Sequence, residues 1–174
     1  DTVERAIKKA SSKDQGDYKE INYEGYAPHG IAIFIETATD NLNRTVANVR
    51  SYFTKYNGSL GTTGSVEFLF ERKCHFKIDK GEHDPEELEL ELIDFGIEEL
   101  FEEEEFIMIY GEFSNFGNIQ KGLEELNIPV IESGYERIPL NTLELSQEQQ
   151  EDVEKLLEKL EEDEDVNEVY HTMQ

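Results

Sequence analysis

The chain has 174 residues, of which 41 are Asp or Glu and 16 are Lys or Arg, so its formal net charge is −25 at pH 7. Such an acidic balance argues against a polyanion as a partner of the whole surface, because phosphate binding depends largely on Lys and Arg. The longest apolar run, residues 30–35, is far shorter than the ~20 residues that cross a bilayer. The single cysteine, Cys74, excludes an internal disulfide. We therefore predict a globular cytoplasmic protein without a membrane segment or a secretory signal.

The first residues show helical spacing, with Val3, Ile7 and Ala10 on one face before a polar break at residues 11–16. The chain has no initiator Met. We interpret residues 1–20 as the remnant of an upstream helical domain or linker.

A β-α-β series follows. The apolar run at residues 30–35 is typical of a buried strand. Asp40 or Asn41 can cap a helix that ends near Gly58, and alternation at residues 66–71 predicts a second, half-buried strand.

A second series begins near Cys74. Asp84 and Pro85 are typical of a helix start, and the acidic turn Glu102–Glu105 divides the next apolar segment into two strands. A further helix and a strand at residues 130–138 complete a β-α-β-β-α-β order, which is the ferredoxin-like pattern.

The tail adds a predicted strand at residues 141–145, a helix with a capping box of Ser146 and Gln149, and a last strand from Val166. These elements complete the sheet that the first series begins. We therefore predict an α+β fold, an α/β sandwich of two ferredoxin-like domains with the second inserted into the first. The expected domains are residues 21–76 with 140–174, and an acidic insert at 77–139.

Charge is distributed unevenly along the chain. Residues 1–76 hold ten basic and ten acidic side chains, so the remaining residues carry the entire net charge of −25. No Asp or Glu occurs between Asp40 and Glu67, where about six would be expected from an even distribution.

This acid-free segment is predicted to contact phosphates. A helix N-terminus with amide, hydroxyl and cationic side chains offers donors to phosphate oxygens, and a nearby carboxylate would oppose them. The alternative is that Asn41 and Asn43 only cap the helix and that local packing excludes acids. The candidate nucleic-acid-binding residues are Asn41, Asn43, Arg44, Thr45, Asn48, Arg50, Lys55, Lys8 and Lys9.

Other motifs carry weaker signals. The glycine-rich loop at residues 57–66 lacks the Lys and the spacing of a Walker loop, and Cys74, His75 and His83 fit no common zinc pattern. The acidic runs do not follow the EF-hand order, and the sequence places no Ser-His-Asp constellation. We expect no metal, no cofactor and no enzymatic activity.

Five strings resemble the YebC/PmpR family: "ERAIKKA", "YEGYAPHG", "TDNLNRTVANVR", "GSLGTTGSVEFLFER" and "DVNEVYH". The resemblance implies a three-domain protein whose N-terminal, mainly helical domain is absent from this chain, with the third domain inserted into the second. It also implies a role in gene expression, since family members are described as DNA-binding transcriptional regulators, as mitochondrial translational activators, or as factors acting on stalled ribosomes. The chain departs from the family pattern at Ala27, His29 and Leu42.

The resulting hypothesis is a nucleic-acid-directed regulator of gene expression, a DNA-binding transcriptional regulator of the YebC/PmpR type. The first alternative is a ribosome-associated translational activator that relieves stalling, and the second is an acidic protein-interaction module without nucleic-acid contact. The expected partner is DNA, or the ribosome and its RNA, reached mostly through the upstream domain. A monomer is expected.

Overall fold

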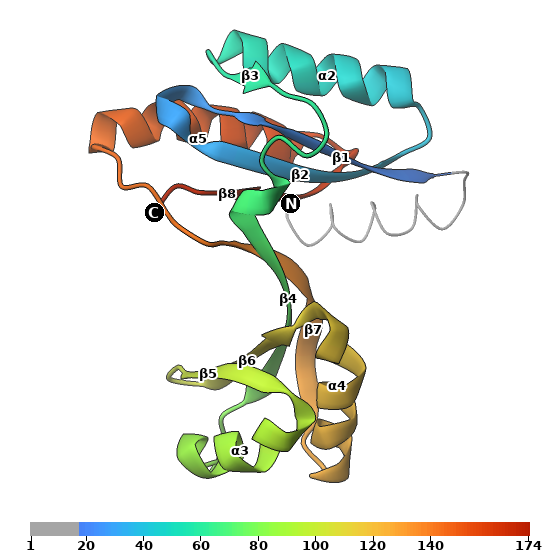
Figure 1. Ribbon diagram of the computed structural model, residues 1–174, viewed down its shortest axis with the longest axis vertical. Coiled ribbons are helices and arrows are strands. Elements are labelled where there is room, and N and C mark those ends of the chain that lie inside the picture. The colour runs from blue at the N-terminus through green and yellow to red at the C-terminus, as the bar shows by residue number, and fades with distance from the viewer. Residues whose placement is uncertain (1–17) are drawn as a thin grey trace. The chain divides into compact units, whose positions relative to one another are not determined.

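The computed structural model describes residues 18–174, which divide into two compact units (Figure 1). Unit 1 contains the residues up to Phe70 together with Pro139–Gln174, and unit 2 contains Glu71–Ile138. The predicted α+β fold is confirmed. Lys8, Lys9 and the apolar face predicted near the start of the chain lie outside the described residues.

Unit 1 contains a four-stranded sheet in the order β3-β1-β2-β8, in which every neighbouring pair is antiparallel. Two helices pack against one face of this sheet and form a single core with it. The elements are β1 (Lys19–Tyr26), β2 (Ala32–Thr39), α2 (Leu42–Lys55), β3 (Ser59–Leu60), α5 (Gln147–Glu162) and β8 (Val166–His171).

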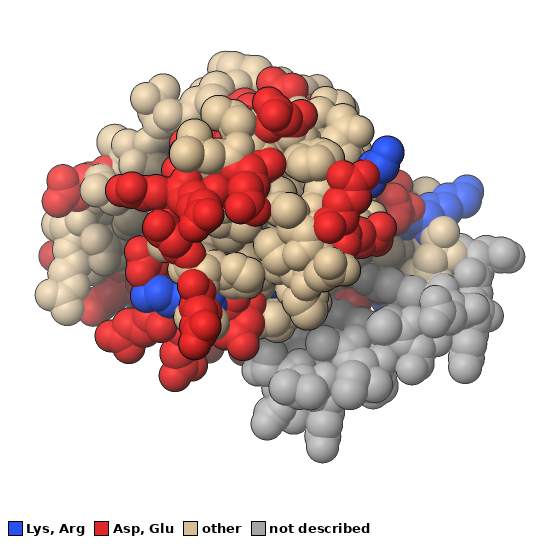
Figure 2. All heavy atoms as spheres, turned by 90° about the horizontal axis from the view of Figure 1, so that it is seen from below, with Lys and Arg blue, Asp and Glu red and all other residues tan. Residues whose placement is uncertain are grey.

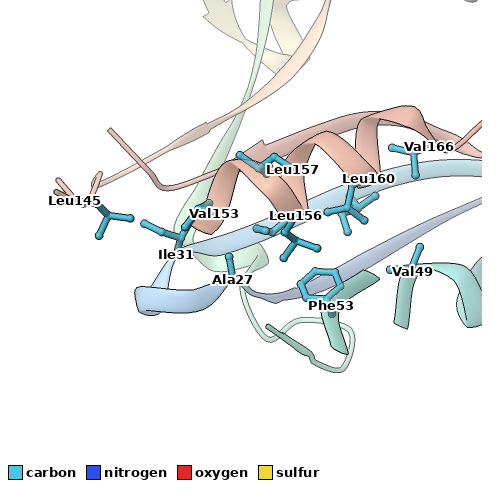
Figure 3. Close-up of a cluster of buried hydrophobic side chains, with 12 residues drawn as sticks. Ala27, Ile31, Val49, Phe53, Leu145, Val153, Leu156, Leu157, Leu160 and Val166 are labelled. Carbon is cyan, nitrogen blue, oxygen red and sulfur yellow. The ribbon is translucent and has the colours of Figure 1, made fainter. Parts of the chain in front are cut away.

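The core of unit 1 follows from two periodicities. In the strand segment, Ile31, Ile33 and Ile35 alternate toward the helices. In α5, Val153, Leu156, Leu157 and Leu160 recur at helical spacing, and all four are buried against the sheet and α2 (Figure 3). The predicted capping box holds the start of α5, because the Ser146 side chain accepts from Gln149 N and the Gln149 side chain accepts from Ser146 N.

Strand β1 was missing from the sequence-based series. Its position beside β2 is that of the third strand of a ferredoxin-like sheet, so unit 1 is a permuted version of that fold in which this strand comes first. Ile21, Tyr23 and Gly25 alternate with Glu20, Asn22 and Glu24 along the strand. That alternation was the signal that could have revealed it.

Two strands that the sequence predicted for unit 1, at residues 66–71 and 141–145, do not form as predicted. Residues 67–69 form a 3₁₀ turn, Glu67–Leu69, and the following strand begins only at Phe70. Val66 and Phe70 pack onto Ala32 and Phe34 on the face of β2 opposite the helices, whereas Phe68 remains 68% exposed. Residues 141–145 form no strand, because Leu143 makes only an isolated bridge to Met173.

Unit 2 has the predicted order β-α-β-β-α-β, and its sheet runs β5-β6-β4-β7. Asp84 caps the first helix by accepting from Glu86 N, and Pro85 occupies the first helical position. The elements are β4 (Phe70–Asp79), α3 (Pro85–Leu92), β5 (Ile97–Glu102), β6 (Phe106–Glu112), α4 (Phe116–Glu125) and β7 (Val130–Pro139). Because β4 runs unbroken through Phe76, the domain boundary predicted at 76/77 falls within a strand.

The two faces of the unit 2 sheet differ. On one face, Cys74, Phe76 and Ile78 of β4 and Ile107 and Ile109 of β6 are buried beneath α3 and α4. The intervening residues therefore point to the opposite face, which no helix of unit 2 covers.

Among residues 18–174, no helix has the length and apolar character required to cross a bilayer.

Candidate nucleic-acid interface

The predicted contact segment, residues 41–66, contains all of α2 and the loop that follows it. Asn41 caps the helix, because its Oδ1 accepts from Arg44 N at 3.1 Å. Thr39 Oγ1 accepts from Asn41 N at 3.0 Å and thereby orients the cap. An open depression of about 500 Å³ lies at this helix start, lined by Lys19, Thr39, Asp40, Asn41, Leu42, Asn43 and Arg44.

Arg44, a predicted nucleic-acid contact, does not project freely outward. Its guanidinium binds both carboxylate oxygens of Asp165, with Nε 3.2 Å from Oδ2 and Nη2 2.9 Å from Oδ1, and Nη2 also lies 3.0 Å from Asp40 Oδ1. The Asp165 side chain is only 9% exposed, whereas that of Arg44 is 46% exposed. The hydrogen bonds that Arg44 donates to Asp165 and Asp40 raise the pKa of Arg44. Arg44 therefore fixes α2 to the turn before β8, and a phosphate would have to compete with two carboxylates for it.

Thr45 is excluded as a contact residue. Its side chain is buried, and its hydroxyl lies 2.8 Å from Asp165 Oδ2 and 3.1 Å from the Asn41 carbonyl oxygen. A hydroxyl without exposed surface cannot reach a phosphate. Thr45 instead supplies a third donor to the Asp165 carboxylate.

A second carboxylate from the same turn binds the C-terminal half of α2. The Tyr52 hydroxyl donates to Asp163 Oδ2 at 2.7 Å. Burial, with this hydrogen bond and the charge of Asp163 as smaller causes, raises the pKa of Tyr52 to about 12. Asp163 Oδ1 also accepts from the backbone N–H of Asp165 at 2.8 Å, so Asp163 orders the turn that carries both carboxylates.

The glycine-rich loop has an anion of its own. The buried carboxylate of Glu24 accepts from the backbone N–H groups of Gly64 at 2.6 Å, Val66 at 2.9 Å and Glu67 at 2.6 Å. Gly64 adopts φ +89°, a conformation that favours glycine, and this brings the donors to one side. The loop is thus a nest for an internal carboxylate, and its donors are already occupied.

The absence of acids between Asp40 and Glu67 therefore has a structural component. Asp163, Asp165 and Glu24, all outside the segment, fill the roles that local acids could have had. The packing alternative explains the cap, Arg44, Thr45 and the loop.

The exposed face of α2 remains. Arg50 and Lys55 are exposed there, and within residues 18–174 the ion pairs of this helix involve Arg44 alone. Lys55 Nζ lies 5.6 Å from the centre of the Tyr56 ring. The other exposed side chains of the helix are small, polar or apolar: Leu42, Asn43, Ala47, Ser51 and Thr54. Asn48 is half-buried on the same helix.

Neighbouring cysteine and histidine side chains of β4 do not combine into a metal site. Cys74 faces the buried core, whereas His75 follows it on the opposite face of the sheet. Burial raises the pKa of the Cys74 thiol. Within the part of the chain that the structure describes, no three His, Cys, Asp or Glu residues are placed to hold a metal ion.

Over the whole chain, 41 Asp and Glu residues stand against 16 Lys and Arg residues. Asp and Glu cover much of the face in Figure 2, and Lys and Arg are sparse on it. The carboxylate-free face of α2 is thus an exception in a chain of net charge −25.

Comparisons with known proteins place the chain. A sequence model described as the TACO1/YebC second and third domain matches residues 18–173. A "Probable transcriptional regulatory protein" from Flavobacterium psychrophilum is 65% identical over 100% of this chain and 74% of the relative, and one from Porphyromonas gingivalis is 60% identical over 99% and 72%. A crystal structure of a conserved hypothetical protein from Aquifex aeolicus matches with a TM-score of 0.78 and 37% identity, covering 99% of this chain and 72% of that one. The family that the sequence resembles is therefore confirmed, and the chain belongs to the TACO1/YebC family.

Proposed function

We propose that the protein is a nucleic-acid-directed regulator of gene expression, of the DNA-binding transcriptional type, and that the exposed face of α2 contacts phosphates. One observation carries the proposal: Arg50 and Lys55 lie on a helix face without carboxylates, in a chain where Asp and Glu outnumber Lys and Arg by 41 to 16. Relatives named probable transcriptional regulatory proteins support it. These names describe regulators, in agreement with the prediction that the chain is not an enzyme.

The chemistry of this face suits the phosphate backbone better than the bases. Asn43 offers an amide donor, while Ala47 and Ser51 are small enough to let a phosphate approach the helix closely. Two cations neutralise few phosphates, and the remainder of the chain repels them. We therefore expect this surface to position the protein on the nucleic acid. Its affinity should depend strongly on salt, and also on the part of the relatives' sequence that this chain does not cover.

The experiment compares two variants with the same change in net charge. Arg50→Glu with Lys55→Glu alters the proposed face, whereas Lys121→Glu with Lys155→Glu places the same charges on exposed positions of α4 and α5. Binding to a duplex DNA fragment and to a single-stranded RNA is measured across a salt series. The α2 variant should bind more weakly and lose about 0.9 from the salt slope per phosphate contact on duplex DNA, or about 0.7 on a single strand.

The outcomes separate the alternatives. Equal losses in both variants would mean that only net charge matters, and the proposed face would be wrong. A selective loss on RNA, with none on DNA, would favour the ribosome-directed alternative over promoter binding. Crosslinking in cells that recovers neither DNA nor ribosomal RNA would contradict both.

A further inference from the structure

The face of the unit 2 sheet opposite α3 and α4 carries a set of aromatic and flexible side chains that the proposed function does not use. We name it the open face and define it by His75 and Lys77 of β4, Phe101 of β5, and Phe106, Met108 and Tyr110 of β6. The strand register places Tyr110 between Glu99 and His75, and Met108 between Phe101 and Lys77. Cross-strand neighbours of this kind form a continuous surface.

The aromatic side chains of the open face contact one another. The Phe101 and Tyr110 rings meet edge to face with centroids 5.8 Å apart, and the His75 and Tyr110 rings lie 6.3 Å apart. Lys77 Nζ lies 4.4 Å from the centre of the Phe106 ring, which shows that this surface already holds a cation over an aromatic ring. Phe101 is nevertheless 48% exposed, so its ring retains free surface.

Carboxylates flank the aromatic side chains on both sides. Glu99 of β5 lies next to Tyr110 of β6. On the other side, Glu136 Oε2 of β7 lies 2.8 Å from His75 Nδ1. That contact is close in distance but lacks hydrogen-bond geometry, so within the described residues His75 Nδ1 has no hydrogen-bond partner. Burial, followed by the charges of Glu136 and Glu99, raises the pKa of Tyr110. The field at the centre of the open face is therefore negative.

Two of the basic side chains near this face are paired with carboxylates, whereas Lys77, on the face itself, lies over the Phe106 ring. Lys73 Nζ lies 2.8 Å from Glu98, and Lys80 forms an ion pair with Glu102. Unit 2 as a whole has 20 Asp or Glu and six Lys or Arg. A single-stranded nucleic acid could stack on such rings, but its phosphates would meet this excess of carboxylates.

We propose that the open face docks a Lys- and Arg-rich protein segment that also carries apolar side chains. An Arg guanidinium can stack on the Phe101 or Tyr110 ring and pair with the Glu99 carboxylate, a combination that Lys reproduces only in part. Met108 supplies a flexible apolar contact at the centre. Charge complementarity thus selects a basic protein segment as the partner, and this inference does not depend on the contact proposed for α2.

The experiment uses the whole chain and a labelled peptide of alternating Arg and Leu, with a Glu and Leu peptide and a single-stranded RNA as competing probes. Phe101→Ser with Glu99→Lys alters two exposed positions of β5. Leu90→Ser with Glu91→Lys makes the corresponding changes, an exposed apolar side chain to Ser and Glu to Lys, on α3, where Leu90 is 73% exposed but lies away from the open face. We expect the β5 variant to bind the Arg and Leu peptide about tenfold more weakly, and the α3 variant to bind it unchanged.

A mapping experiment accompanies the affinities. Peptide binding should shift the amide resonances of β4, β5 and β6 more than those of α3 and α4. Equal weakening by the two variants, no binding of the Arg and Leu peptide, or tighter binding of the RNA on these strands would each overturn the proposal. Binding of the Glu and Leu peptide with similar affinity would overturn the role of charge.

Discussion

Residues 41–66 contain no Asp or Glu side chain, and residues 81–120 contain no Lys or Arg. The two segments differ in where the charges that interact with them lie. The first segment is bonded to buried carboxylates from distant parts of the chain: Asp165 binds Arg44 and Thr45, and Glu24 binds the loop that ends the segment. The second segment has 14 carboxylates, all of them exposed, and half of these lie on α3 and on the turn between β5 and β6. A segment that lacks one sign of charge can therefore either bind a charged partner from a distant part of the chain or form a charged surface.

Removing the carboxylate of Asp165 should have the largest effect on stability. Asp165→Ala leaves Arg44 and Thr45 without their shared acceptor, and we expect a loss of about 2 to 3 kcal/mol, below the range for a fully buried pair because Arg44 is half exposed. Denaturant unfolding measures it. Asp152→Ala is the matched control, since it removes a carboxylate from an exposed pair with His29 and should cost about 0.5 kcal/mol. Similar losses in both variants would contradict the internal role of Asp165.

Replacing Glu24 tests the second internal anion. Glu24→Gln exchanges one acceptor oxygen for an amide group that faces backbone N–H donors, and we expect a loss of about 2 kcal/mol with faster proteolysis of residues 61–67. Glu20→Gln on the same strand is exposed and should stay within about 0.5 kcal/mol of the parent. If Glu24→Gln leaves both the unfolding curve and the cleavage rate unchanged, the loop does not depend on its carboxylate.

These long-range contacts could not be predicted from the sequence, whereas local features could. Unit 2 could be predicted because its signals are local: Asp84 and Pro85 start a helix, and the acidic turn separates β5 from β6. The capping box of Ser146 was predictable for the same reason. The sequence presented Arg44 as a candidate phosphate contact, but no spacing reveals a partner 121 positions away. Because Arg44 has this long-range partner, the test of the α2 face uses Arg50 and Lys55 and leaves Arg44 unchanged.

The permuted sheet of unit 1 was missed for a related reason. Strand β1 pairs with β2 across a short turn, and its alternation of Ile21 and Tyr23 with polar residues identifies a strand but not its place in the sheet. Its place between β3 and β2 depends on β3, which has only two residues and no pattern of its own. Topology here follows from packing that no local window contains.

Tyr52 offers a smaller test with a defined pH dependence. Its pKa in the folded chain is about 12, and the ordinary value for an unfolded chain is about 10. The folded state thus keeps a proton that the unfolded state loses, so this stabilisation is present below pH 10 and is lost as the pH rises toward 12. Tyr52→Phe should lower the free energy of unfolding by about 1 kcal/mol at neutral pH. It should also remove the step at the highest pH from a tyrosinate absorbance titration. Persistence of that step would assign it to another tyrosine.

The smallest effect should come from the acidic turn of unit 2. Glu103→Lys with Glu104→Lys changes two exposed side chains, while the backbone bond from Glu103 N to the Phe106 carbonyl oxygen, at 2.9 Å, does not need either carboxylate. We expect the free energy of unfolding to change by no more than about 0.5 kcal/mol, and to rise, because the substitution relieves repulsion within a segment without Lys or Arg. Added salt should raise the stability of the parent more than that of the variant, since it screens the same repulsion. A loss above about 1 kcal/mol would mean that these carboxylates have specific partners, as Asp165 does, and the contrast between the two segments would no longer hold.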